Sequence, residues 1–445
     1  MIPYIPHTEE DRTHMLKALG LAKVEDLFTC IPEAHRKPKL NLPPPLSEVE
    51  VLKELSRLAH KNIHAGEKAF FLGAGVYRHF IPAAVEAVAS RGEFLTSYTP
   101  YQPEASQGTL QAVFEYQSLL ADLLGMDTVN ASHYDGATAL AEAVLLSYRA
   151  TARTKVVISS ALHPEYLETL YTYTEPHDLQ IRGIKQGLWK PEDLSALLDE
   201  STACVVVPFP TFFGDLVDYR KLCVEAHAKG ILVVVSVDPI CLALFEPPGS
   251  YGADIVTGEG QSLGNSLSFG GPGLGIFATR GDLLRRMPGR LTGLTCDRSQ
   301  RRGFVLTLNT REQHIRREKA TSNICTNQGH LALRAAVYLS LMGKIGLRKV
   351  AELIYQKAQY AAKRLSAVPG FKLGNTGPFY QEFVLQCPKV AETLCSQLQD
   401  YNILGGLPLS RYYPERNQEL LVCVTELNTR QEIDHYAETL ATLTR

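Results

Sequence analysis

Residues 203–238 read ACVVVPFPTFFGDLVDYRKLCVEAHAKGILVVVSVD, and this stretch decides the fold class of the chain. Two runs of branched apolar residues, ACVVV and ILVVV, enclose DYRKLCVEAHAKG, which has the composition of a helix. Strands without polar alternation are buried on both faces, and intervening helices connect them as right-handed parallel crossovers. The stretch therefore predicts one strand–helix–strand unit of a mostly parallel sheet.

The same alternation continues towards the N-terminus. Strand-like KVVISS and LQIRGIK are separated from each other and from ACVVVPFP by helical HPEYLETLYTYT and PEDLSALLDE. Before them, GTLQAVFEYQSLLADLLG has the apolar spacing of a helix that ends at Gly125. We expect a large α/β domain over residues 66–310.

The two ends of the chain have different patterns. Residues 1–65 predict an arm with short helices at 9–19 and 48–61, the second opening on Ser47 and Glu50 at capping-box spacing. The Pro-rich stretch between these helices is expected to be extended.

Residues 311–445 predict a smaller α+β domain. It begins with a long helical region over 310–354 and ends with the strands FYQEFVLQC and QELLVCVTE and a helix over 429–442.

Composition excludes several classes of protein. The formal net charge is −2, with 45% hydrophobic and 21% charged residues, so no global field favours nucleic acid or a membrane surface. The nine cysteines follow no zinc or disulfide spacing, which is typical of a reducing cytosol. The first residues lack the profile of a signal peptide, and no apolar run is long enough to span a bilayer. We expect a cytoplasmic protein without a metal site.

In open parallel sheets, ligands bind beyond the carboxyl ends of the strands. Asp238 ends the ILVVVSVD strand, His163 follows KVVISS, and the Gly-rich loop 258–273, GEGQSLGNSLSFGGPG, follows GADIV. This arrangement resembles the large domain of pyridoxal-phosphate (PLP) enzymes of the aspartate aminotransferase fold, fold type I. In that class the Asp holds the pyridine nitrogen protonated, and a ring at the His position stacks on the cofactor.

Local structure explains some of these residues equally well. Asp238 and Pro239 suit the start of a helix, and His163 suits a loop that leads into the next helix. Asp135 precedes an Ala-rich helix, where it would repel a phosphate, and we interpret it as an N-cap.

A lysine is missing from the place where this class needs one. PLP is held as an imine on a primary amine in the Gly-rich loop, yet no lysine stands between Lys229 and Lys319. Gln261 occupies the expected position, and its amide nitrogen is not nucleophilic. The sequence therefore predicts a vestigial cofactor pocket of His163, Asp238 and Gln261, with no covalent catalytic residue.

Two further segments have more polar and aromatic groups than an ordinary surface. SYTPYQPEASQG is a stiff loop with convergent polar groups, or alternatively an aromatic packing corner; its residues of interest are Tyr98, Tyr101, Gln102 and Glu104. QHIRREKATSN suits an anion or a carboxylate-bearing partner, or alternatively is a solvated helical face; its residues of interest are Arg316, Lys319, Thr321 and Ser322.

Taken in order, these segments resemble one known family over essentially the whole chain. The segments are GAGVYRHFIP, SYTPYQPEASQGTLQAVFEYQ, YDGATALAEA, YGADIVTGEGQSLG, LSFGGPGLGIFA and QHIRREKATSNICTNQ. They are similar to the α subunit of two-subunit glycine dehydrogenase (decarboxylating), the P-protein of the glycine cleavage system. Thr211 in FPTFFG departs from the asparagine expected there.

The resemblance implies a heteromeric enzyme, and active sites of this fold lie at subunit boundaries. The β subunit carries PLP on a lysine, and α and β form an α2β2 heterotetramer. The reaction decarboxylates glycine and transfers its aminomethyl group to the lipoyl group of H-protein. The YTPYQPE loop and the RREKATS segment are then expected to wall the partner's active site. The alternatives are an independent PLP decarboxylase or aldolase, and a noncatalytic scaffold subunit.

Overall fold

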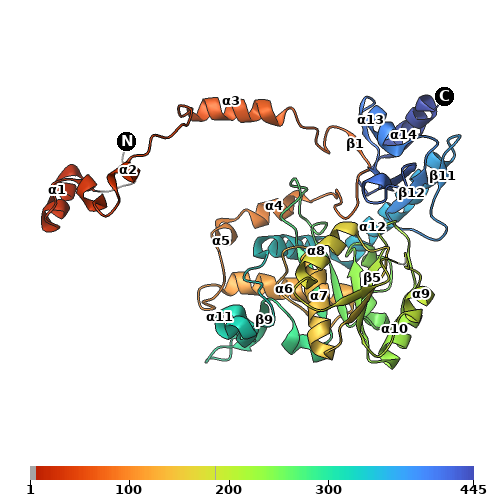
Figure 1. Cartoon of the computed structure of the whole chain (residues 1–445), viewed down its shortest axis with the longest axis horizontal. Helices are drawn as coiled ribbons and strands as arrows, with labels where there is room; N and C mark the ends of the chain where they lie inside the picture. The colour runs from red at the N-terminus through yellow and green to blue at the C-terminus, as the bar shows by residue number, and fades with distance from the viewer. Residues whose placement is uncertain (1–6, 186, 445) are drawn as a thin grey trace. The chain divides into compact units, whose positions relative to one another are not determined.

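The computed structural model describes residues 7–185 and 187–444, and the chain divides into two units, Met1–Ile63 and His64–Arg445. The first unit contains α1 (Glu9–Ala18), the 3-10 turn η1 (Val24–Phe28), α2 (Glu33–Arg36) and α3 (Glu48–Ala59) (Figure 1). Both helices predicted for the arm are confirmed. Ser47 and Glu50 form the predicted capping box, in which the Ser47 side chain accepts from the Glu50 N–H.

The second unit is built on a mixed sheet. Its strands are β2 (Thr128–Val129), β3 (Lys155–Ile158), β4 (Gln180–Arg182), β5 (Thr202–Phe209), β6 (Leu232–Val237), β7 (Ile255–Glu259) and β8 (Gly275–Thr279). Over the described part of the chain, their order is β2-β8-β7-β6-β5-β3-β4. Strands β4, β3, β5, β6 and β7 are parallel, and β8 runs antiparallel to both β7 and β2. The predicted mostly parallel sheet is confirmed.

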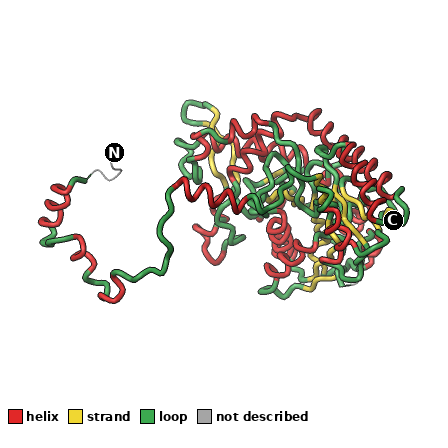
Figure 2. Tube along the Cα trace, turned by 90° about the horizontal axis from the view of Figure 1, so that it is seen from above, coloured by secondary structure: helices red, strands yellow, loops and turns green. Residues whose placement is uncertain are grey.

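Helices cover both faces of this sheet (Figure 2). They are α6 (Gln107–Leu124), α7 (Gly136–Thr151), α8 (Pro164–Thr174), α9 (Pro191–Ala196) and α10 (Arg220–Ala228). Successive strand residues point to opposite faces. Val205 and Val235 therefore pack in one core cluster with α6, whereas Cys204 and Val234 pack in another with α7.

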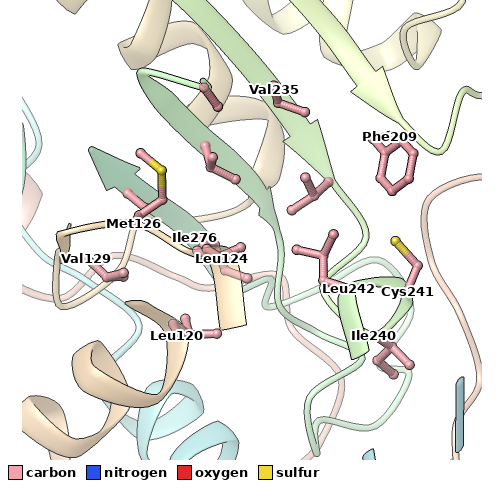
Figure 3. Packing of buried hydrophobic residues seen from close by; sticks show 14 of the residues in the cluster. Leu120, Leu124, Met126, Val129, Phe209, Val235, Ile240, Cys241, Leu242 and Ile276 are labelled. Carbon is pink, nitrogen blue, oxygen red and sulfur yellow. The ribbon is translucent and has the colours of Figure 1, made fainter. Parts of the chain in front are cut away.

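Figure 3 shows part of the core on the α6 side. Leu120 and Leu124 of α6 lie near Ile276 of β8, and Val235 of β6 belongs to the same cluster. All of these side chains are fully buried. This packing on both faces explains the uninterrupted apolar runs of β5 and β6, which leave neither strand with a polar face.

The C-terminal part adds a second, smaller sheet. Its strands are β11 (Lys372–Leu373), β12 (Glu382–Gln386), β14 (Leu407–Pro408) and β15 (Glu419–Cys423), and its helices are α12 (Gly329–Ser366), α13 (Ala391–Gln399) and α14 (Arg430–Leu443). The short strand β1 (Ala69–Phe70) pairs in parallel with β13 (Ile403–Leu404). Helix α12 contributes to the cores of both sheets, with Ala332 in one and Leu365 in the other. The domain boundaries at 65/66 and 310/311 stay predictions.

The remaining elements connect these layers. They are α4 (Ala83–Ala89), α5 (Gly92–Leu95), the hairpin β9 (Leu291–Cys296) and β10 (Arg302–Thr307), α11 (Gln313–Arg316), and the 3-10 turns η2 (Cys241–Ala243), η3 (Pro248–Tyr251), η4 (Gly281–Arg286), η5 (Asn309–Arg311), η6 (Arg317–Lys319) and η7 (Leu409–Arg411). No helix within the described ranges combines the length and apolar character needed to cross a bilayer.

The long helical region expected over 310–354 is wrong in its first half. Residues 320–328 form no helix, and Arg317 has a positive φ of 52°. This stretch, ATSNICTNQ, is rich in short polar and β-branched side chains that compete with helical hydrogen bonds. Ser322 Oγ, for example, accepts the N–H of Ile324 at 3.1 Å.

Candidate functional site

A cavity of about 70 Å³ lies at the carboxyl ends of β5, β6 and β7. The predicted residues His163, Asp238 and Gln261 all line it, together with Thr211. A wider cleft of about 450 Å³ shares His163 and Gln261 with this cavity and extends along the Gly-rich loop 266–273. The sheet therefore brings the three predicted pocket residues together at the place where parallel sheets bind ligands.

His163 both lines the cavity and begins a helix. Its Nδ1 accepts the N–H of Glu165 at 3.1 Å, which caps α8, and its Nε2 lies 2.7 Å from the carbonyl oxygen of Ala74. The ring is thus the neutral tautomer that donates from Nε2. Burial lowers the pKa of His163, which keeps it uncharged.

Each carboxylate oxygen of Asp238 accepts one hydrogen bond from a neutral donor. Its Oδ1 accepts the N–H of Ile240 at 2.9 Å, and its Oδ2 accepts Nε2 of Gln381 at 2.7 Å. Burial raises the pKa of Asp238 above its ordinary value. Asp238 lines the cavity and bonds the N–H of Ile240, but the next helical turn, η2, begins only at Cys241 with Ile240 as its N-cap, so Pro239 is not a first helical residue. A cofactor role for Asp238 stays a prediction.

Gln261 turns its side chain back onto its own loop. Its Nε2 donates to the carbonyl oxygen of Asn265 at 2.5 Å.

Glu259, which ends β7, accepts hydrogen bonds from three backbone N–H groups. Its Oε1 accepts the N–H groups of Gln261 at 2.9 Å and Leu274 at 2.7 Å, and its Oε2 accepts that of Gly136 at 3.0 Å.

The N-terminus of α7 is consequently occupied by carboxylates. Gly136 is the first residue of α7 and donates to Glu259, while Thr138 N donates to Asp135 Oδ1 at 2.7 Å. The predicted N-cap role of Asp135 is confirmed. A phosphate would need these same N–H groups.

Glu382 contributes another carboxylate from the C-terminal sheet. Its Oε1 accepts the N–H of Ala74 at 2.6 Å, and its Oε2 accepts the Tyr77 hydroxyl at 2.7 Å. Burial, reinforced by the nearby charge of Asp238, raises the pKa of Glu382 to about 7. Thr211 does not reach into this network, because its hydroxyl accepts the N–H of Asp215 at 3.0 Å.

These residues do not fit covalently held PLP. The cavity-lining side chains of the described residues include no lysine to form the imine and no arginine to hold the phosphate. The helix N–H groups that would bind a phosphate are taken by Glu259 and Asp135, and Asp238 is already bonded to Gln381. Within the same ranges, no His, Cys, Asp and Glu side chains are grouped as a metal site.

A second pocket, of about 220 Å³, is lined by Arg290 and by Tyr98 and Pro100 of the predicted loop. The Arg290 side chain is 8% exposed. It donates from Nη1 to Asn327 Oδ1 at 3.0 Å, and from Nη2 to Tyr101 Oη at 3.0 Å and to the carbonyl oxygen of Cys325 at 2.8 Å. Its Nε lies 3.9 Å from Glu312 Oε2. Arg290 thereby joins the loop to the segment that precedes α12.

The remaining predicted loop residues point to solvent. Tyr98 is 93% exposed and lines the Arg290 pocket, and Gln102 and Glu104 are also exposed. Tyr101 is 55% exposed, with its ring 5.3 Å from the Arg290 guanidinium. The loop is therefore packed at Tyr101, whose ring also lies 6.2 Å from that of His314, and exposed at Tyr98.

The residues predicted in the second segment separate into two groups. Arg316 and Lys319 are exposed on short helical turns. Thr321 and Ser322 are partly buried, and Ser322 Oγ donates to the buried Glu142 at 2.5 Å. The contact with the YTPYQPE loop comes instead from Cys325 and Asn327. A role for these predicted residues towards a partner stays a prediction.

Sequence reasoning missed Glu259, Gln381, Glu382 and Arg290. Glu259 could have been found, because it ends a predicted parallel strand two residues before Gln261. The other residues carried no local signal. Arg290 and Tyr101 are 189 positions apart, and Asp238 and Gln381 are 143 apart.

Comparisons with known proteins identify the family of the chain. Residues 3–440 match the glycine cleavage system P-protein family. A protein of Thermomicrobium roseum named probable glycine dehydrogenase (decarboxylating) subunit 1 is 51% identical over 441 residues, 98% of each chain. One of Desulforamulus reducens with the same name is 50% identical over 443 residues, 99% of each chain.

Solved structures extend the comparison to the fold. A crystal structure of glycine decarboxylase (P-protein) of the glycine cleavage system, in inhibitor-bound form, has a TM-score of 0.92 and 44% identity, covering 99% of this chain and 100% of that one. A C-DES variant with glycine linked to its PLP cofactor has a TM-score of 0.61 at 15% identity, covering 84% and 96%, which shows the fold alone. The chain therefore belongs to the glycine cleavage system P-protein family and has the fold of the PLP-dependent fold type I enzymes.

Proposed function

We propose that this chain is the α subunit of a two-subunit glycine dehydrogenase (decarboxylating) and works only with a second, PLP-binding β subunit. The reaction removes carbon dioxide from glycine and passes the aminomethyl group to the lipoyl group of H-protein. The relatives at about half identity are named subunit 1, which supports a second subunit. We place the assembly, an α2β2 heterotetramer, in the cytoplasm. The free state of all nine cysteines, each of which is described, supports a reducing compartment.

One observation carries the proposal: the strand-end cavity cannot hold the cofactor itself. Gln261 stands in the Gly-rich loop with its amide bonded to Asn265, and Glu259 fills the N–H groups at α7. PLP supplies an electron sink for decarboxylation where it is bound, which we place on the second subunit. This residue chemistry also disfavours an independent PLP decarboxylase or aldolase.

We further propose that this chain walls the partner's active site with the YTPYQPE loop. Tyr98, Tyr101, Gln102 and Glu104 would shape the channel for glycine and the lipoyl arm, and Arg290 would hold the loop in place. Arg316, Lys319, Thr321 and Ser322 would lie towards the partner's cofactor or the docking H-protein. A wall that excludes water strengthens the electrostatic interactions of a developing carbanion.

Reconstitution tests the shared site. This chain and the candidate second subunit are purified separately and after co-expression, and glycine–bicarbonate exchange is measured with lipoylated H-protein. Exchange is expected only from the co-expressed assembly. Exchange by this chain alone with PLP, or a borohydride-trappable PLP adduct on one of its lysines, would overturn the proposal.

Variants of the YTPYQPE loop test whether the loop contributes to catalysis or whether this chain is a noncatalytic scaffold. In the assembled enzyme, Tyr98→Phe and Gln102→Ala are expected to lower the exchange rate while assembly, measured by analytical ultracentrifugation, is unchanged. The exposed Tyr401 provides a matched control as Tyr401→Phe. Unchanged exchange in both loop variants would favour the alternative that this chain is a noncatalytic scaffold. In that case, substitutions would alter assembly but not the turnover of the assembled enzyme.

A further inference from the structure

The strand-end cavity has acidic walls and no cationic side chain to balance them. Asp238, Glu259 and Glu382 line it, and the wider cleft adds Asp135 and Glu165. Among the described residues that line either space, none is lysine or arginine, and His163 is held in its neutral form. The charge on these walls is opposite to that of a phosphate-binding pocket.

Two buried oxygen atoms in the same cavity are unsatisfied. Gln381 and Ser262 are 2% and 4% exposed, and both line the cavity. Within the described part of the chain, Gln381 Oε1 and Ser262 Oγ have no hydrogen-bond partner. A buried polar group without a partner costs free energy, so each of these oxygens favours a donor from a ligand.

We propose that the cavity binds a small alkylammonium cation of the size of methylammonium, in place of the anionic cofactor that its fold relatives hold. Each wall carboxylate already accepts from neutral donors and retains further lone pairs. The N–H groups of an ammonium each need one acceptor, which this arrangement supplies. A divalent ion such as Ca²⁺ instead takes a close shell of about 6 to 8 oxygens.

The inner cavity suits a small ligand. Its volume of about 70 Å³ has room for a few water-sized groups, since one water needs roughly 10–15 Å³. Methylammonium has only one carbon and one nitrogen, whereas tetramethylammonium is larger and has no N–H donor. Burial raises the pKa of Asp238, Glu259 and Glu382, as expected where a compensating positive charge is missing.

The test uses the full-length chain without the second subunit, so its result does not bear on the proposed wall. Binding of ¹³C-methylammonium chloride is followed by NMR line broadening at constant chloride concentration. Saturable broadening is expected, with release by ammonium chloride and no release by tetramethylammonium chloride. No saturable binding, or equal competition by tetramethylammonium, would overturn the proposal.

Variants locate the binding. Glu382→Gln and Asp238→Asn keep the side-chain shape and are each expected to weaken binding about tenfold, as for one charged hydrogen bond. Glu438→Gln changes an exposed carboxylate and is expected to bind like the wild type. Equal affinity in all of these proteins would contradict the assignment. The competition experiment on the wild type decides the question even if a variant is unstable.

Competition by anions tests whether the cavity prefers a negatively charged ligand. Sodium phosphate and PLP, added to the wild-type chain under the same conditions, are expected not to displace methylammonium. Displacement by phosphate at constant ionic strength would mean that the cavity still prefers an anion, and the proposal would fail.

Discussion

Arg290 donates a 3.0 Å hydrogen bond to the hydroxyl of Tyr101, and its guanidinium carbon lies 5.3 Å from the centre of the same ring. Arg290 also bonds the carbonyl oxygen of Cys325 and the side chain of Asn327. A planar guanidinium can serve several acceptors in fixed directions, whereas an ammonium cannot. The YTPYQPE loop and the segment before α12 are therefore held together by one buried cation.

Replacing Arg290 is expected to loosen this loop. Arg290→Lys keeps the charge but loses the fork geometry, and we expect a loss of about 2 kcal/mol in the free energy of unfolding. Urea denaturation of the full chain measures it, and the assembled enzyme should lose exchange activity as well. Arg298→Lys, the same substitution at an exposed arginine, is the control. Wild-type stability and activity in Arg290→Lys would mean that Arg290 does not hold the loop.

Tyr101→Phe removes one partner of Arg290 without removing the ring. Its expected cost is smaller, about 1 kcal/mol, because a single hydrogen bond is lost and the cation–π contact remains. The matched substitution Tyr401→Phe at an exposed tyrosine should leave unfolding unchanged. Equal behaviour of the two variants in urea denaturation would contradict the role of the Tyr101 hydroxyl.

Stability should depend on pH through Glu382. Its pKa is raised from 4.5 in the unfolded chain to about 7 in the folded state, chiefly by burial. Between these values the folded state holds a proton that the unfolded state has released, so the contribution of Glu382 to stability falls as pH rises from about 4.5 to 7.

Glu382→Gln is expected to remove this slope. At about 1.4 kcal/mol per pKa unit, the variant should gain on the order of 2–3 kcal/mol relative to wild type between pH 4.5 and 7, and no more above pH 7. Asp238, whose pKa is also raised by burial, titrates in both proteins. Urea denaturation at several pH values measures the difference, with Glu438→Gln as control. A pH-independent difference would show that Glu382 does not titrate in this range.

The stability of the chain is expected to depend on both carboxylate oxygens of Glu259 as hydrogen-bond acceptors. In Glu259→Gln, one oxygen could still accept the N–H groups of Gln261 and Leu274, but the new NH₂ group would face the N–H of Gly136. We expect a loss of about 1–3 kcal/mol in the free energy of unfolding. If Glu259→Gln were as stable as wild type in urea denaturation, a carboxylate at position 259 would not be needed to accept these three N–H groups.

A lysine introduced at position 261 is not expected by itself to make this chain bind PLP covalently. Gln261→Lys supplies an amine, but the α7 N–H groups remain with Glu259 and Asp135, and Asp238 remains bonded to Gln381. We expect no borohydride-trappable PLP adduct and no new absorbance band on addition of PLP. Stoichiometric trapping at position 261 would show that the missing amine is the only obstacle.

Elements with strong local signals were predictable. The β5 and β6 strands follow from uninterrupted apolar runs, and the caps of α3 and α7 follow from Ser47 and Asp135, since each depends on neighbours within a few residues. The non-helical stretch 320–328 was missed because the helical spacing on either side concealed its competing Ser, Thr and Asn side chains.

The sequence by itself determined the class of sheet, the strand ends at which a site forms, and the lack of any lysine between Lys229 and Lys319. Only the tertiary structure decided which distant residues meet in the candidate pocket and at the YTPYQPE loop. Glu259 binds the N–H of Gly136, Gln381 binds Asp238, and Arg290 binds Tyr101 across 123, 143 and 189 positions. The physical reason is that hydrophobic and capping patterns act between chain neighbours, whereas these hydrogen bonds exist only once folding brings distant residues within bonding distance.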